Sequence, residues 1–281
     1  MDKHQFHKII RPLTDPASYG GDPEDAFHLV CPSMPGYGFS DAPSKPGFNI
    51  RSVAETNIKL MAKLGYSRYG AQGGDWGAIA TAWNGHLDPE HVCGIHMNMI
   101  VATPPEGVEN PMEGLSPEEM GDVASIAEFT QKETGYQQIQ GSKPQTLGYG
   151  LMDSPSGLAG WIVEKFRTWS DCNGNVENRF TKDELLTNIM IYWVTGSITS
   201  STRLYCETSR AGLMAGGMPQ VTVPTGAAIF PKEIYRAPRA WAANHYNIQH
   251  WNRYDSGGHF AALEEPDTLV EDVRTFFRAL R

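Results

Sequence analysis

Short apolar runs alternate with amphipathic stretches over the first hundred residues. Apolar side chains recur at helical spacing in residues 53–64, and Gly65 then predicts the end of a helix. Apolar runs without that spacing predict strands. The predicted elements are a buried strand at 27–31 that ends at Pro32, the helix at 53–64, a strand and turn at QGGDWG (72–77), a helix to about Asn84, and a strand near 92–99.

The pattern changes after Ile100. Residues 102 to about 217 show no strong strand alternation, whereas Ser116 followed by Pro117 is typical of the start of a helix. Further helices are predicted at 161–169 and 185–205. The alternating pattern then resumes with a strand at 220–223, a helix near 238–246, a strand near 247–254 and a final helix at 266–280.

Alternation of strand and helix predicts an α/β fold with a mostly parallel sheet. We therefore assign residues 1–100 and 219–281 to an α/β core, and residues 101–218 to a helical lid inserted into it. No repeat and no low-complexity tract interrupts this organisation.

Composition places the chain among ordinary soluble globular proteins, because 40% of its 281 residues are hydrophobic and 20% are charged. The net charge of −9 argues against a nucleic-acid partner, which would usually require a basic field. No apolar run reaches the roughly 18 residues of a membrane span, and the N-terminal residues lack the apolar core of a signal peptide. The sequence therefore predicts a cytoplasmic protein without a membrane span.

The four cysteines, at positions 31, 93, 172 and 206, are scattered and form no CxxC pair. This spacing is typical of reduced thiols, and it argues against a disulfide framework or a zinc site.

A glycine-flanked aspartate stands between a predicted strand and a predicted helix. The pattern Gly73-x-Asp75-x-Gly77 fits a nucleophile elbow, in which small neighbours allow a strained turn that presents one side chain. The amides at the start of the following helix, from Trp76, favour an anion. Glycine-rich turns are common, so this string alone is compatible with a plain turn.

Two further pieces occur in the order that this fold requires. His259 follows two glycines late in the chain, just after a predicted strand, and Glu233 lies beyond the strand at 220–223. The simpler interpretation is a surface histidine and an exposed glutamate beside Lys232. The other eight histidines lack this context and are interpreted as structural or surface residues.

The sequence resembles the epoxide hydrolases of the microsomal and juvenile-hormone type, which belong to the α/β-hydrolase superfamily. The resemblance covers nearly the whole chain. It rests on PSMPGYGFSDAP (32–43), GGDWG (73–77), TGYQQIQGSKPQTLGYGLMDSPSGLAGWIVEKF (134–166), YWVTGSITSSTRLYCE (192–207), VPTGAAIFPKE (223–233) and GGHFAALEEP (257–266).

This resemblance implies a mechanism. Asp75 would attack an epoxide carbon to give a covalent alkyl ester, and His259, oriented by Glu233, would activate water to hydrolyse it. Two lid tyrosines, matched by Tyr136 and Tyr205, would donate hydrogen bonds to the epoxide oxygen. The backbone N–H of Trp76 would stabilise the oxyanion of the second step. The implied partners are a small apolar epoxide and water, with no metal and no cofactor.

Family members resembling this chain also have an HGxP loop after an earlier strand, and no HGxP occurs here. We therefore expect an N-terminally truncated chain whose sheet is incomplete on that side, which could favour a homo-oligomer through the exposed edge. Two alternatives stay open. One is a hydrolase like the haloalkane dehalogenases, against which the two tyrosines argue, and the other is an inactive truncated gene product.

Overall fold

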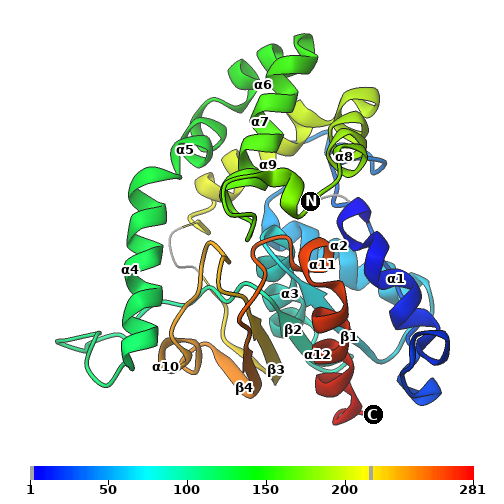
Figure 1. Cartoon of the computed structure of the whole chain (residues 1–281), viewed down its shortest axis with the longest axis vertical. Coiled ribbons are helices and arrows are strands. Elements are labelled where there is room, and N and C mark those ends of the chain that lie inside the picture. The colour runs from blue at the N-terminus through cyan, green and yellow to red at the C-terminus, as the bar shows by residue number, and fades with distance from the viewer. Residues whose placement is uncertain (1–2, 215–217) are drawn as a thin grey trace.

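The strands form one parallel sheet in the order β1-β2-β3-β4 (Figure 1). The computed structural model describes residues 3–214 and 218–281. The strands are β1 (Tyr69–Gly73), β2 (Val92–Met97), β3 (Val221–Ile229) and β4 (Tyr246–Arg253). The fully parallel pairing and the intervening helices confirm the predicted α/β class.

Helices cover both faces of the sheet (Figure 1). Helices α2 (Ile50–Lys63) and α3 (Trp76–Leu87) lie on one face, while α1 (His7–Thr14) and α12 (Pro266–Arg278) lie on the other. Two short helices, α10 (Arg239–Ala242) and α11 (Ala261–Glu264), and the 3₁₀ turns Lys3–Phe6, Pro16–Tyr19 and Pro23–Asp25 belong to this part, whereas the 3₁₀ turn Val176–Asn178 lies between α7 and α8. Burial on both faces explains why the central strands have nearly continuous apolar runs.

Strand β3 is longer than the sequence pattern predicts. The prediction of a strand at 220–223 was wrong at its end, because β3 continues through Pro224 to Ile229. The pairing register with β4 shifts between Val221 and Pro224. Proline cannot donate to the ladder, and such an irregularity is where a strand tolerates it. The predicted helix at 238–246 was likewise too long, since α10 is a single turn.

Among the described residues between β2 and β3, helices α5 to α9 form a layer beyond the end of the sheet, while α4 runs alongside the sheet on the β4 side (Figure 1). Their bounds are α4 (Pro117–Lys132), α5 (Gly135–Ser142), α6 (Pro144–Asp153), α7 (Pro155–Thr168), α8 (Lys182–Thr195) and α9 (Ile198–Arg210). The predicted start of α4 is confirmed, since Ser116 and Glu119 form a reciprocal capping box. The single helix predicted at 185–205 was wrong: Gly196 has φ of +63° and ends α8 before α9 begins.

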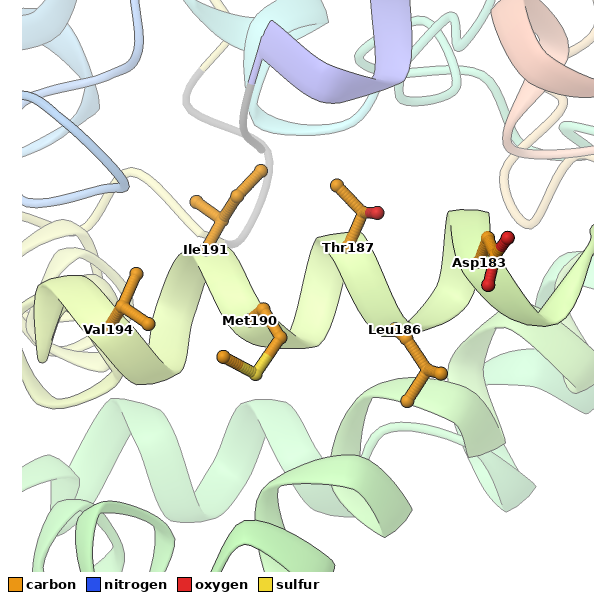
Figure 2. A pocket seen from close by; sticks show the side chains of 6 residues that line it. All are labelled: Asp183, Leu186, Thr187, Met190, Ile191 and Val194. Atoms are coloured by element: carbon orange, nitrogen blue, oxygen red, sulfur yellow. The ribbon is translucent and has the colours of Figure 1, made fainter.

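Helix α8 presents apolar side chains to a surface depression of about 480 Å³. Figure 2 shows Leu186 and Met190 on the opposite side of the helix from Thr187 and Ile191. The residues that line the depression are Asp183, Leu186, Thr187, Met190, Ile191 and Val194. All of them belong to α8, so this depression is separate from the candidate catalytic residues described below.

The predicted buried strand at 27–31 was wrong. This segment has no regular secondary structure and belongs to no sheet, and the Phe27 N–H donates instead to the Leu13 carbonyl at 2.9 Å. Its side chains are partly or fully exposed. A cavity of about 590 Å³ separates it from β1, which pairs with β2 as its only described neighbour in the sheet. An apolar run becomes a strand only where another strand supplies hydrogen bonds, and none described lies beside this one.

None of the helices in residues 3–214 and 218–281 combines the length and apolar character needed to cross a bilayer.

Candidate active site

Asp75 occupies the tight turn between β1 and α3. Its φ of +51° and ψ of −131° lie in a region that non-glycine residues rarely adopt. Neighbouring glycines make the turn sterically feasible. A Cβ on Gly73 would lie 2.3 Å from the carbonyl of Gly77, and one on Gly74 would lie 2.6 Å from the Asn98 amide. The strained turn therefore holds the Asp75 carboxylate at the carboxyl end of the sheet.

The Asp75 carboxylate contacts two groups through different oxygens. Oδ1 accepts a hydrogen bond of 2.6 Å from the backbone N–H of Trp76. Oδ2 lies 3.1 Å from Nε2 of His259, whose Nδ1 lies 2.6 Å from Oε1 of Glu233. The histidine and the glutamate are 2% and 1% exposed, so water cannot compete for their contact. The structure thus aligns a carboxylate, an imidazole and a second carboxylate.

The two carboxylates determine the charge of the imidazole between them. Burial alone would lower the pKa of His259, but the charges and hydrogen bonds of Glu233 and Asp75 outweigh it and raise that pKa to about 10. Burial alone would raise the pKa of Asp75, and the hydrogen bond and charge of His259 instead lower it. At neutral pH the structure therefore favours an imidazolium flanked by two carboxylates.

Asn98, just beyond the end of β2, supports the buried glutamate. Its Nδ2 lies 3.5 Å from Oε2 of Glu233, and its Oδ1 accepts a hydrogen bond of 3.2 Å from Gln72 Nε2. The backbone N–H of Ile234 donates to the other glutamate oxygen at 2.7 Å. Sequence analysis missed Asn98, although a polar residue at the end of an apolar strand beside the elbow strand was a usable signal.

Two tyrosines from the helical layer meet beside the elbow. Tyr136 in α5 and Tyr205 in α9 have ring centroids 5.9 Å apart in an edge-to-face arrangement. The Tyr205 ring also packs edge-on against Trp76 at 4.8 Å. Burial raises the pKa of both phenols, and the negative charge of Asp75 raises each further. Both hydroxyls are therefore protonated at neutral pH and can act as hydrogen-bond donors.

Trp169, at the end of α7, connects the helical layer to the histidine. Its carbonyl accepts a hydrogen bond of 2.9 Å from the His259 N–H. Its ring lies 5.2 Å from the His259 ring and 5.1 Å from the Tyr136 ring, centroid to centroid. The structure thus brings together all six residues that the sequence singled out: Asp75, Trp76, Tyr136, Tyr205, Glu233 and His259. Their proximity does not test their catalytic roles, which stay predictions.

Residues 1–148 match the family model described as alpha/beta hydrolase fold, which covers just over half of the chain. The chain belongs to the α/β-hydrolase family. The predicted fold is therefore confirmed. The turn that carries Asp75 lies within the residues that match this family.

Individual relatives of this α/β-hydrolase chain carry epoxide hydrolase names. A Stigmatella aurantiaca protein provisionally named an epoxide hydrolase is 44% identical over 99% of this chain and 62% of its own length. Epoxide hydrolase 1 of Sus scrofa is 41% identical over 99% of this chain and 65% of its own length. The chain thus spans less than two thirds of these curated relatives.

A solved structure shows the same likeness. The juvenile hormone epoxide hydrolase of the silkworm Bombyx mori superposes with a TM-score of 0.90 and 34% identity. The match covers 100% of this chain and 70% of that one. Within the α/β-hydrolase family, this chain is therefore similar to epoxide hydrolases of the microsomal and juvenile-hormone types.

Proposed function

We propose that this protein hydrolyses an epoxide to a vicinal diol through a covalent ester on Asp75. The main observation that supports this proposal is the alignment of Asp75, His259 and Glu233, in which Oδ2 of Asp75 lies 3.1 Å from Nε2 of His259. The Tyr136 and Tyr205 hydroxyls supply the acid groups that ring opening needs. The names of the relatives, all of them longer than this chain, support the same assignment.

The first step forms a carbon–oxygen bond between Asp75 and the substrate. Because Oδ1 is held by the Trp76 N–H, Oδ2 is the oxygen placed to attack an epoxide carbon. The epoxide carbon–oxygen bond breaks, and Tyr136 or Tyr205 donates a proton to the departing oxygen. The product of this step is a hydroxyalkyl ester of Asp75 and one tyrosinate.

The ester then changes the charge balance at His259. Alkylation neutralises Asp75, so the imidazolium loses one of the two carboxylates that raise its pKa. Its proton can then restore the tyrosine, which leaves a neutral imidazole next to the ester. In the free protein the charge of Asp75 helps to keep His259 protonated. Once the first step has removed that charge, His259 can act as a base.

The second step consumes water. Neutral His259 takes a proton from water, and the resulting hydroxide attacks the ester carbonyl carbon. The Trp76 N–H lies 2.6 Å from Oδ1, so it is placed to stabilise the oxyanion at that atom. Collapse releases the diol and restores both the Asp75 carboxylate and the His259 imidazolium, so that atoms and charges balance over the cycle.

The division into core and lid is part of this proposal. Residues 1–100 and 219–281 would supply Asp75, Glu233 and His259, and residues 101–218 would close over them with the two tyrosines. The apolar and aromatic surroundings of the site suit a small apolar epoxide as substrate.

The direct experiment is hydrolysis of styrene oxide by the 281-residue chain. We expect diol formation by the unchanged protein and its loss in Asp75→Ala. Asp153→Ala, which changes an exposed aspartate in α6, is the matched control and should retain full activity. Turnover that persists in Asp75→Ala, in protein shown to be folded by circular dichroism, would contradict the proposed mechanism.

A further inference from the structure

Two histidines approach each other across the middle of the sheet, on the face covered by α12. His96 of β2 and His250 of β4 both pair in register with Gly226 of β3, which lies between them. A Cβ on Gly226 would lie 2.8 Å from the ring of Phe276 and 3.0 Å from Cδ2 of His96. The glycine therefore leaves the space in which two imidazoles from next-but-one strands can meet.

Asp272 of α12 completes the group from above the sheet. Its Oδ1 lies 2.7 Å from Nε2 of His96 and 3.0 Å from Nε2 of His250. These three ligand atoms all lie within 4.8 Å of one another. The other carboxylate oxygen accepts hydrogen bonds from the Asn252 amide, at 2.7 Å, and from the Tyr254 hydroxyl. Nδ2 of Asn252 also lies 3.1 Å from Nε2 of His250, so this amide contacts both the carboxylate and one of the imidazoles.

We propose that His96, His250 and Asp272 form a binding site for a divalent transition metal ion, for which zinc is the best match. Two imidazoles and one carboxylate are a ligand set that zinc uses in proteins, whereas calcium and magnesium prefer oxygen ligands alone. Ligands that each lie about 2.0–2.2 Å from one ion are separated from each other by roughly 3 Å. The two nitrogen-to-oxygen separations of 2.7 Å and 3.0 Å are close to that spacing, and all three ligand atoms lie within 4.8 Å of one another.

The two carboxylate oxygens of Asp272 have different partners. Tyr254 and Asn252 donate hydrogen bonds to Oδ2, and the two imidazoles lie against Oδ1. Without an ion, the two imidazoles form hydrogen bonds to Asp272. A bound ion would replace those hydrogen bonds. Without an ion, each oxygen of Asp272 therefore already has a hydrogen-bond partner, and the chain does not depend on metal to keep this geometry.

One atom limits the expected affinity. Nδ1 of His96 is buried and has no hydrogen-bond partner among the described residues. When Nε2 binds an ion, Nδ1 must carry the proton, and most ligating histidines donate that proton to a neighbouring acceptor. We therefore expect weaker binding than at a site where each ligating histidine donates that proton to an acceptor. Entry would be from the side of β4, because the His250 side chain is 16% exposed whereas His96 and Asp272 are fully buried.

The test is calorimetric titration of the full chain with zinc chloride at pH 8, followed by the absorption spectrum with cobalt(II) chloride. We expect one ion per chain, tetrahedral cobalt bands and a higher Tm with zinc. His250→Ala should weaken binding at least tenfold, while His91→Ala, which changes an exposed histidine beside Asp88, should leave it unchanged. In His250→Gln the side-chain amide can still donate a hydrogen bond to Asp272. This variant therefore tests metal binding in a protein that keeps its fold.

Absence of one-to-one binding by the unchanged chain would overturn this proposal, as would equal affinity in folded His250→Gln. Binding that His91→Ala abolishes would place the ion elsewhere and would also overturn it. The titration does not depend on the proposed epoxide hydrolysis, since it can be run on Asp75→Ala with the same expected result.

Discussion

The backbone N–H of His259 donates a hydrogen bond of 2.9 Å to the carbonyl of Trp169. This bond joins the loop that carries the imidazole to the end of α7, in the helical layer that also carries Tyr136. The imidazole contacts the elbow through Asp75, so core and helical layer both fix its position. The base and the acid groups of the proposed reaction are therefore positioned by one connected set of contacts.

Replacement of Asn98 should slow the reaction without weakening substrate binding. Asn98→Ala removes the amide beside Glu233 and leaves one oxygen of a buried carboxylate without that partner. We expect kcat and KM to fall together by roughly 10-fold with kcat/KM little changed, since the loss acts through His259 and slows hydrolysis of the ester rather than its formation. Steady-state kinetics measure this split. Asn247→Ala, at an exposed asparagine in β4, is the control, and an equal effect there would contradict the assignment.

The two tyrosines should act on the first chemical step. Tyr136→Phe and Tyr205→Phe each remove one hydroxyl that would donate to the epoxide oxygen, so alkylation should slow by about 10²–10⁴. Stopped-flow measurement of ester formation reports that step directly. Tyr149→Phe, at a ring that is 68% exposed, should behave as the unchanged protein. Normal alkylation in both site variants would remove the tyrosines from the mechanism.

Gly73 should be irreplaceable for steric reasons. Gly73→Ala places a methyl group 2.3 Å from the carbonyl of Gly77, and both are backbone positions in the elbow. We expect a clear fall in Tm together with loss of activity. Gly160→Ala, within α7, meets no atom within 4 Å and should be neutral or stabilising by up to about 1 kcal/mol. Differential scanning calorimetry compares the two, and equal Tm values would contradict the close approach.

The ionisation of His259 should contribute to stability in a defined pH window. Its pKa is raised to about 10 in the folded protein, against about 6.5 in an unfolded chain. The stabilisation is therefore fully present below about pH 6.5 and is lost as the pH rises through about 10. Urea denaturation at pH 7 and pH 10.5 measures the loss. His259→Gln should show a smaller decrease over that range, and an unchanged decrease would assign it to other groups.

Much of the candidate site could be predicted from the sequence, because Asp75, Glu233 and His259 lie in short motifs at strand ends. The place of Asn98 at the end of an apolar strand was a signal, but its role was not predicted because that role depends on β1, β2 and the turn after β3 lying side by side. The proximity of His96 and His250 could not be predicted for the same reason. The two residues are 154 positions apart in the chain, and they come close because both pair in register with Gly226.

The errors in the fold have equally local causes. Residues 27–31 have the apolar pattern of a strand, but a pattern cannot show whether a neighbouring strand is present to pair with it. Gly196 divides the predicted helix at 185–205, because its left-handed backbone ends α8. Pro224 would ordinarily end a strand, yet a shift of register lets β3 continue past it.

The central claim is that Asp75 forms a covalent ester with the substrate. In His259→Gln the ester should form but hydrolyse slowly, so it should accumulate when the protein is mixed with styrene oxide. Intact-protein mass spectrometry should then show a mass increase of one substrate molecule, and peptide mapping should locate it on Asp75. An unmodified mass, or an adduct on another residue, while the unchanged protein turns over the epoxide, would contradict this account.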